Sequence, residues 1–268
     1  MEQSFSKYEV KWYGWVRDLP DHRDLVYAAP ADVLRALPAF VDLRRQLDVP
    51  AYDQGELGSC TGNAIAAAVQ FARSKGHEGP DFVPSRLFIY YNERAIERTV
   101  DQDSGAQIRD GMKAVAKVGV CPESSRPRRD HDWPYVADHL ASRPPEACYQ
   151  FAAQHQVLAY RRIPQLVTQL RGCLASGFPF VFGFMVYEGF ETVEVARTGV
   201  VNLPASSEKA LGGHAVLAMG YDDAAQRFIV RNSWGTDWGQ GGYFTMPYAY
   251  LTDVQLAADF WTVRRVEA

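Results

Sequence analysis

The sequence predicts an α+β fold with two lobes of different type that pack side by side. Three helical patterns occupy the stretch from residue 60 to residue 119. Short β-rich runs fill the last third of the chain, and a connection with five prolines, residues 121–147, separates the two parts. Because long connections often bridge two units, we expect residues 38–155 to form a helical lobe and residues 156–268 a β-rich lobe.

Each helical pattern has its own signature. Residues 60–73 are small and apolar and contain no proline, which favours a buried helix. Residues 84–98 begin with a proline, which suits a first helical turn, and keep an apolar face. Residues 106–119 are amphipathic and end at a glycine, which is typical of a helix C-terminus.

The second lobe is predicted from a series of short apolar runs. They are "FPFVFGFMVY", "GGHAVLAMGYDD", "QRFIVRNSWG", "GGYFTM" and "DFWTVRR". Aromatic and β-branched residues are frequent in these runs, and glycine and aspartate stand between them. Each run is therefore expected to be a strand.

The composition is that of an ordinary globular chain, with 47% hydrophobic and 22% charged residues. The net charge of −4 gives no indication of a nucleic-acid-binding surface, and the basic run "RPRRDH" is short. No run approaches the roughly 18 apolar residues of a membrane span, and the N-terminus lacks the apolar core of a signal peptide. We expect a cytoplasmic protein, or one exported by a non-classical route, with no nucleic-acid or membrane partner. The pattern leaves the oligomeric state open.

The four cysteines are Cys60, Cys121, Cys148 and Cys173. If one of them is reactive, the three that remain cannot all pair with one another. A reduced compartment therefore fits better than a disulfide framework. No CxxC or HxxxH spacing occurs, and we predict neither a metal site nor a cofactor.

Three separate segments carry residues suited to thiol chemistry. Cys60, in "YDQGELGSCTGNA", lies at the first turn of a predicted helix, where the helix dipole favours a thiolate. His214 follows two glycines, which let the backbone approach another element, and begins a strand pattern. Asn232 ends a β-rich run, and its amide can accept a ring N–H, while Trp234 can keep water from that bond. Each residue alone fits a structural role equally well.

Together, these segments resemble the papain-like cysteine peptidases. "QGELGSC" is similar to that family's nucleophile segment, "GGHAVLAMGY" to its histidine segment and "VRNSWGTDWGQGGYF" to its asparagine segment, in the family's order. "LPAFVDLR" (37–44) resembles the start of the mature domain. The resemblance implies a two-lobe fold with a β-barrel-like second lobe and an active-site cleft between the lobes.

The resemblance also implies roles for individual residues. Cys60 would be the nucleophile, and His214 its ion-pair partner and the general acid for the leaving amine. Asn232 would orient His214. Gln54 and the backbone N–H of Cys60 would form an oxyanion hole, in which one donor is worth about 3 kcal/mol.

The substrate side of the site is expected from the same resemblance. In this family a glycine-rich segment binds the substrate backbone as an extended strand. A pocket beside it takes the side chain second from the scissile bond, on its N-terminal side, and we expect an apolar or aromatic preference there. The candidate residues are Ser104, Gly105 and Ala106 in "QDSGAQIRDG", Gly213 beside the histidine, and Phe184, Met185 and Ala215 around the pocket. Phe184 and Met185 fit an ordinary strand core equally well.

The expected function is that of a cysteine endopeptidase that acts on peptides or proteins. One alternative is an acyl transferase or peptide ligase, in which an amine takes the place of water. Another is a catalytically silent binding module, although all four catalytic residue types are present. The sequence departs from the family pattern at Thr61, where a tryptophan is usual, and at Leu57, where a half-cystine is usual.

Residues 1–37 precede the segment that resembles the mature domain. They fit a short pro-segment near the cleft, or a permanent extension that packs through Trp12, Tyr13 and Trp15. We expect this segment to restrain the enzyme, because its aromatic residues can cover an apolar groove. A tethered segment also acts at a high effective concentration.

Overall fold

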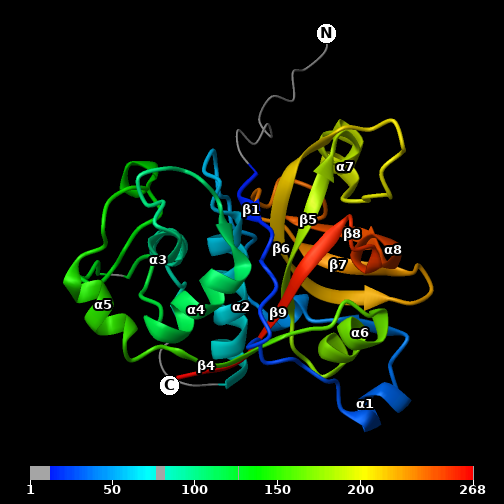
Figure 1. The fold of residues 1–268 in the computed structure, drawn as a ribbon, viewed down its shortest axis with the longest axis horizontal. Helices are drawn as coiled ribbons and strands as arrows, with labels where there is room; N and C mark the ends of the chain where they lie inside the picture. Colours follow the sequence, from blue (N-terminus) through cyan, green and yellow to red (C-terminus); the bar gives the residue numbers. More distant parts are fainter. Residues whose placement is uncertain (1–12, 77–81, 126, 268) are drawn as a thin grey trace.

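The computed structural model describes residues 13–76, 82–125 and 127–267. A group of helices lies on one side and an open sheet on the other, with helix α2 (Cys60–Gly76) between them (Figure 1). The fold is therefore α+β, with helices before strands, as the sequence predicts.

The helical side contains three further helices. Their bounds are α3 (Arg86–Glu97), α4 (Ile108–Lys117) and α5 (Glu146–Ala152), with a 3₁₀ turn η3 (Ala137–His139) before α5. Ser85 caps α3 by accepting the backbone N–H of Phe88 at 3.1 Å, so the helix begins after Pro84 rather than at it. The third predicted helix begins two residues late, because Ala106–Gln107 form strand β3 instead.

The sheet has seven strands in the order β4-β9-β5-β6-β7-β8, and β2 also pairs with β6. The bounds are β2 (Phe40–Asp42), β4 (Val157–Arg162), β5 (Phe180–Tyr187), β6 (Ala210–Asp222), β7 (Arg227–Arg231), β8 (Tyr243–Pro247) and β9 (Ala257–Val266). In the described part of the chain, β4 and β8 lie at opposite ends of this order. The sheet is therefore open rather than a closed barrel, and the predicted α+β class with a strand-rich second lobe is confirmed.

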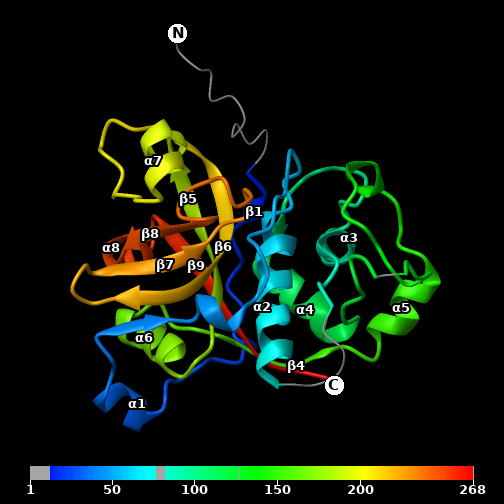
Figure 2. The ribbon, with the colours of Figure 1, turned by 180° about the vertical axis from the view of Figure 1, so that it is seen from behind.

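Short helices and 3₁₀ turns surround the sheet (Figure 2). They are α1 (Ala31–Arg35), η2 (Arg44–Gln46), α6 (Val167–Ala175), η4 (Glu188–Glu191), α7 (Val193–Thr198) and α8 (Tyr248–Thr252). The β2 strand lies in the segment that the sequence assigned to the helical lobe. It joins the sheet because Phe40–Asp42 pair antiparallel with the end of β6.

Helix α2 is buried from Cys60 to Arg73 and packs against α3, β6 and β9. Its small residues allow this close approach. A Cβ at Gly62 would lie only 2.8 Å from the carbonyl oxygen of Arg86, so the contact with α3 requires a glycine. The helix thus carries its first residue into the boundary between the lobes.

The N-terminal residues cross this boundary in an extended form. We call residues 13–27 the strap. Its strand β1 (Trp15–Val16) pairs parallel with β3, so that Trp15 lies opposite Ala106. Figures 1 and 2 show β1 between α2 and the sheet. Trp12, which the sequence analysis grouped with the aromatic cover, lies outside the described residues.

Candidate active site

Cys60 is the first residue of α2 and is fully buried. Three backbone N–H groups are directed at its sulfur, from Ala215 of β6, Gly14 of the strap and Thr61. The helix N-terminus and these donors favour a thiolate, but burial is the larger effect and raises the pKa of the thiol to about 12. The sulfur is therefore protonated while the strap is in place.

His214 lies on β6, immediately before Ala215, and is also fully buried. Its Nε2 lies 2.8 Å from Oδ1 of Asn232, which follows β7. Since an amide oxygen only accepts, this nitrogen carries the proton. Burial lowers the pKa of His214 to about 4, and the bond to Asn232 opposes this shift only partly. The imidazole is therefore neutral, with Nδ1 free of hydrogen bonds to the described residues.

Aromatic rings cover the bond between His214 and Asn232. The rings of Trp234 and His214 lie 5.4 Å apart at 32°, and Trp234 is itself buried. Phe190 contacts the Trp234 ring edge-on at 5.2 Å. This packing excludes water from the side of the imidazole that contacts the amide, as expected for a residue at position 234.

Gln54 is buried in the loop that precedes α2, and both polar atoms of its side-chain amide form hydrogen bonds. Its Nε2 donates to the carbonyl oxygen of Leu57 at 2.8 Å, and its Oε1 accepts the Ser233 hydroxyl at 2.5 Å. One hydrogen of the amide nitrogen remains for another acceptor. Ser233 is a positioning residue that the sequence reading missed, although it stands inside the quoted "NSWG" segment.

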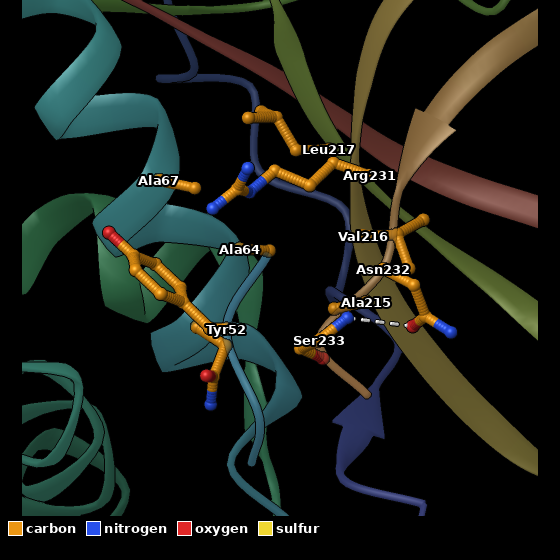
Figure 3. A pocket seen from close by; sticks show the side chains of 10 residues that line it. Tyr52, Ala64, Ala67, Ala215, Val216, Leu217, Arg231, Asn232 and Ser233 are labelled. Carbon is orange, nitrogen blue, oxygen red and sulfur yellow. Dashed lines mark hydrogen bonds between the residues drawn. The ribbon is translucent and has the colours of Figure 1, made fainter. Parts of the chain in front are cut away.

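A small cavity lies beside Asn232, between α2 and β6 (Figure 3). Its volume of about 10 Å³ is close to that of one water molecule. Ala64 and Ala67 face Ala215, Val216 and Leu217 across it, and the Arg231 side chain extends toward α2. Arg231 donates to the carbonyl oxygens of Val49 and Pro50 and to the Tyr243 hydroxyl, which ties the Asn232 loop to the chain before Gln54.

A buried carboxyl group explains the unusual residue after the nucleophile. The Thr61 hydroxyl donates to Glu93 Oε2 at 2.6 Å, and Glu93 is fully buried in α3. Burial raises the pKa of Glu93 to about 8. A tryptophan at position 61 could not make this bond in the same space. Thr61, where the family usually has tryptophan, was thus the one residue in the sequence that indicated a polar partner such as Glu93. The sequence analysis did not predict Glu93.

The strap occupies the space between the nucleophile and the predicted substrate segment. The carbonyl oxygen of Gly14 accepts the N–H of Ala106 at 2.8 Å. A Cβ at Gly14 would lie 1.6 Å from the carbonyl oxygen of Gly58, and a Cβ at Gly105 would lie 2.2 Å from that of Gly14. The backbone thus passes between two chain segments where only glycine fits.

Aromatic residues flank Gly14 on both sides. The Tyr13 ring lies edge-on to His214 at 6.1 Å, and its hydroxyl donates to Glu191. The Trp15 indole faces Gly183 and Gly213, and both glycines lack the Cβ that would overlap it. The strap therefore covers the imidazole and fills the adjoining slot.

The predicted substrate residues fall into two groups. Gly105, Ala106 and Gly213 contact the strap, and the N–H of Ala215 is directed at the Cys60 sulfur. Ser104 is exposed and bonds to Thr99, while Phe184 packs against the core rings of Phe190, Phe244 and Tyr250. Met185 lies on the same face of β5 as Gly183 and is half-buried.

Other features of the described residues limit the chemistry at the site. All four cysteines are free thiols. In the described ranges, no group of three or more His, Cys, Asp or Glu side chains is placed to hold a metal ion, and no helix is long and apolar enough to cross a membrane. A buried cysteine, a histidine and an amide thus define the site, which is the arrangement of a cysteine peptidase.

The comparisons with known proteins agree with this arrangement. The family description "Papain family cysteine protease" matches residues 37–260. The chain is 45% identical to the solved structure of xylellain, a cysteine protease from Xylella fastidiosa, with a TM-score of 0.86 over 96% of this chain and 97% of that one. It is 41% identical to an uncharacterized peptidase C1-like protein of Acanthamoeba polyphaga mimivirus, over 95% of this chain and 87% of that protein. Chymopapain of Carica papaya is 26% identical over 78% of this chain and 54% of its own length.

The chain belongs to the papain family of cysteine proteases, and it is a hydrolase of peptide bonds. The family resemblance read from the sequence is thus confirmed, as is the peptidase function that it implied.

Proposed function

We propose that this protein cleaves peptide bonds as an endopeptidase with Cys60 as its nucleophile and His214 as its acid and base. The observation that supports this most directly is the placement of three groups. His214 is hydrogen-bonded to Asn232 at 2.8 Å, and the residue after His214 directs its N–H at the Cys60 sulfur. These contacts bring one residue of α2 and two of the sheet to a single point.

Each proposed step uses one of these groups. The Cys60 thiol passes its proton to His214, and the thiolate attacks the substrate carbonyl carbon to form a C–S bond. The negative charge moves to the carbonyl oxygen, where the N–H of Cys60 and the free amide hydrogen of Gln54 stabilise it. The C–N bond then breaks as the proton on His214 moves to the leaving amine.

Hydrolysis of the thioester completes the cycle. A water molecule gives a proton to His214 and attacks the acyl carbon, the C–S bond breaks as the acid product forms, and His214 returns its proton to the Cys60 sulfur. Asn232 holds the imidazole plane through both steps. Because an external amine could replace this water, a ligase or transferase would share every residue up to the thioester.

We also assign to the strap the role of a cover that keeps the enzyme latent. With Gly14 and Tyr13 against the site, both the sulfur and the imidazole are buried, and burial favours their neutral forms. The strap also bonds to the β3 backbone that a substrate would need. Release of the strap would return water to the site and permit the thiolate–imidazolium pair.

The test compares the full chain with its Cys60→Ala variant on a fluorogenic peptide library, with an epoxide thiol trap as the second readout. We expect slow turnover and labelling of the unchanged chain, from the fraction of molecules in which the strap is undocked, and a loss of at least about a thousandfold in turnover for the variant, with no labelling. Retained turnover in Cys60→Ala would reject this nucleophile. Product analysis with an added amine separates hydrolysis from ligation.

A further inference from the structure

The slot that holds Trp15 has an acidic floor. The Trp15 Nε1 donates to Asp259 Oδ2 at 3.2 Å, and the backbone N–H of Asp18 donates to the same oxygen at 2.8 Å. Arg162 donates to the other carboxylate oxygen at 3.3 Å. Two of the three donors to Asp259 thus come from the strap, and the carboxylate itself is buried.

The backbone at Asp259 is shaped to present this carboxylate. Its φ is +60°, an unusual value for any residue other than glycine. The register between β5 and β9 shifts at this point, between the pairs Val181–Trp261 and Gly183–Ala258. A bulge of this kind re-aims a side chain, and bulges are common beside active sites. Strained residues of this type are retained where function needs them.

The walls of the slot fit a flat ring. A Cβ at Gly183 would lie 2.0 Å from Cε2 of the indole, and a Cβ at Gly213 would lie 2.7 Å from its Cε3. Both glycines lie on one face of the paired strands β5 and β6. The slot is therefore open on the sheet side because two neighbouring positions have no side chain.

Departure of the strap would leave Asp259 short of donors. Trp15 and Asp18 would leave together, and Arg162 would also lose Asp24, to which it donates at 2.9 Å. The part-exposed Arg162 would then be the remaining partner of the buried Asp259 carboxylate, and their two charges cancel. A buried carboxylate oxygen that has lost its hydrogen-bond donors raises the free energy of the released state. A ligand that supplies one neutral N–H to this oxygen is therefore favoured over a cation and over a purely apolar ring.

We propose that this slot is the specificity pocket of the released enzyme and that Asp259 makes it select a substrate side chain with a ring N–H, tryptophan above all. The proposal rests on the proposed function, because the slot adjoins the site through Gly14 and β3. The strap residue Trp15 then acts as an internal copy of the preferred substrate side chain. Asp259 is the specificity-determining residue, and Gly183 and Gly213 set the shape.

The first experiment measures binding without catalysis. The full-length Trp15→Ala chain should have an empty slot, and indole should raise its thermal midpoint more than benzothiophene does, which has the same shape without the N–H. The unchanged chain, with its slot filled, should show no such difference. Equal effects of the two compounds on Trp15→Ala would overturn the role of Asp259.

The second experiment measures selection during turnover in a full-length Gly14→Ala, Trp15→Ala chain, in which the added Cβ at residue 14 also displaces the strap from Cys60. Peptides carry tryptophan, 3-benzothienylalanine or arginine at the second position before the scissile bond. We expect kcat/KM for tryptophan to exceed that for benzothienylalanine by about tenfold or more, since a hydrogen bond to a charged group is involved. A ratio near one, or a preference for arginine, contradicts the proposal.

A substitution at the floor completes the design. Asp259→Gly keeps the positive φ accessible and removes the acceptor, so the tryptophan-to-benzothienylalanine ratio should fall to about one. Asp138→Gly, at an exposed carboxylate in η3, is the control and should keep the ratio. If no peptide is cleaved but indole still binds selectively, the proposed function is wrong, whereas the selection of a ring N–H by the slot is supported. If peptides are cleaved without selection, the slot assignment fails alone.

Discussion

The backbone N–H of Gly14 is directed at the sulfur of Cys60, so the strap contacts the proposed nucleophile itself rather than only its surroundings. The contact is made by main chain, and it needs the absence of a side chain at residue 14. A methyl group added at residue 14 should therefore displace the strap, without any change in the proposed catalytic residues.

Gly14→Ala should increase peptide hydrolysis by the full chain. The added Cβ would lie 1.6 Å from the carbonyl oxygen of Gly58, so the strap could not keep its present path. A loss of 1.4 kcal/mol in docking corresponds to about tenfold more open enzyme, and we expect at least that gain in the initial rate. Val16→Ala, at an exposed position of the same strap, is the matched control. An unchanged rate in Gly14→Ala would mean that the strap does not limit access.

Removal of residues 1–36 should raise activity but lower the thermal midpoint. The strap buries Trp15, and Asp18 accepts the indole N–H of Trp261 at 2.9 Å and the N–H of Arg109 at 3.0 Å. The deletion leaves the indole N–H of Trp261 and the backbone N–H of Arg109 without their acceptor on Asp18, so the segment is both a cover and part of the fold. Differential scanning calorimetry and peptide hydrolysis on the same preparation test this. A higher rate with an unchanged midpoint would make the strap a cover only.

Asn232→Ala should weaken catalysis less than His214→Ala. The histidine carries the protons, which is worth about 10²–10⁴-fold, whereas the asparagine holds the ring through one bond of 2.8 Å. Trp234 continues to limit the movement of the ring after the amide is removed. Measurement of kcat/KM for both variants in a strap-released background decides the order, and a larger loss for Asn232→Ala would reverse the two roles.

Docking of the strap should weaken as the pH rises from about 4 to about 7. Burial and the neighbouring Asp18 raise the pKa of Asp259 to about 7, and burial also raises the pKa of Asp18. A carboxyl group with a raised pKa binds its proton more tightly in the docked state. Its contribution to docking is therefore present at low pH and lost as the pH passes the raised value.

Two other carboxyl groups, those of Asp24 and Glu97, also change their pKa values on burial. Burial alone would raise the pKa of Asp24, but the bonds from Arg109 and Arg162 lower it, so its contribution is lost only at more acidic pH. Burial raises the pKa of Glu97, on α3, to about 6, in the same direction as Asp259. The rate of epoxide labelling between pH 4 and pH 8, divided by the rate for Trp15→Ala, isolates docking from ionisation of the thiol. A ratio that falls with rising pH would contradict the expected direction.

Much of the site could be expected from the sequence because its residues stand in segments with local signatures. Cys60 begins a helix made of small residues, and His214 begins a long strand, so ordinary helix and strand patterns placed both. Asn232 and Trp234 lie in one glycine-rich turn, and the short segment around them was sufficient to indicate their roles. Each of these patterns involves only residues that are close together in the sequence, and together they include the proposed catalytic residues.

The rest depends on contacts between distant residues, for which a single sequence has no local signal. Trp15 and Asp259 stand 244 positions apart, and nothing near either residue indicates the other. The short strand β2 has only three residues, too few for a periodic pattern. The order of the strands in the sheet could not be predicted for a similar reason, since it depends on which strands pair and not on the strands themselves.

Two adjacent residues hold two different parts of the site. Asn232 bonds to the histidine proposed to carry protons, and Ser233 bonds to the glutamine proposed to stabilise the oxyanion. A single peptide unit therefore sets the distance between proton transfer and charge stabilisation. Separation of α2 from the sheet at this point would break the bond between Ser233 and Gln54 and would move Cys60 away from His214, so both functions would be lost together.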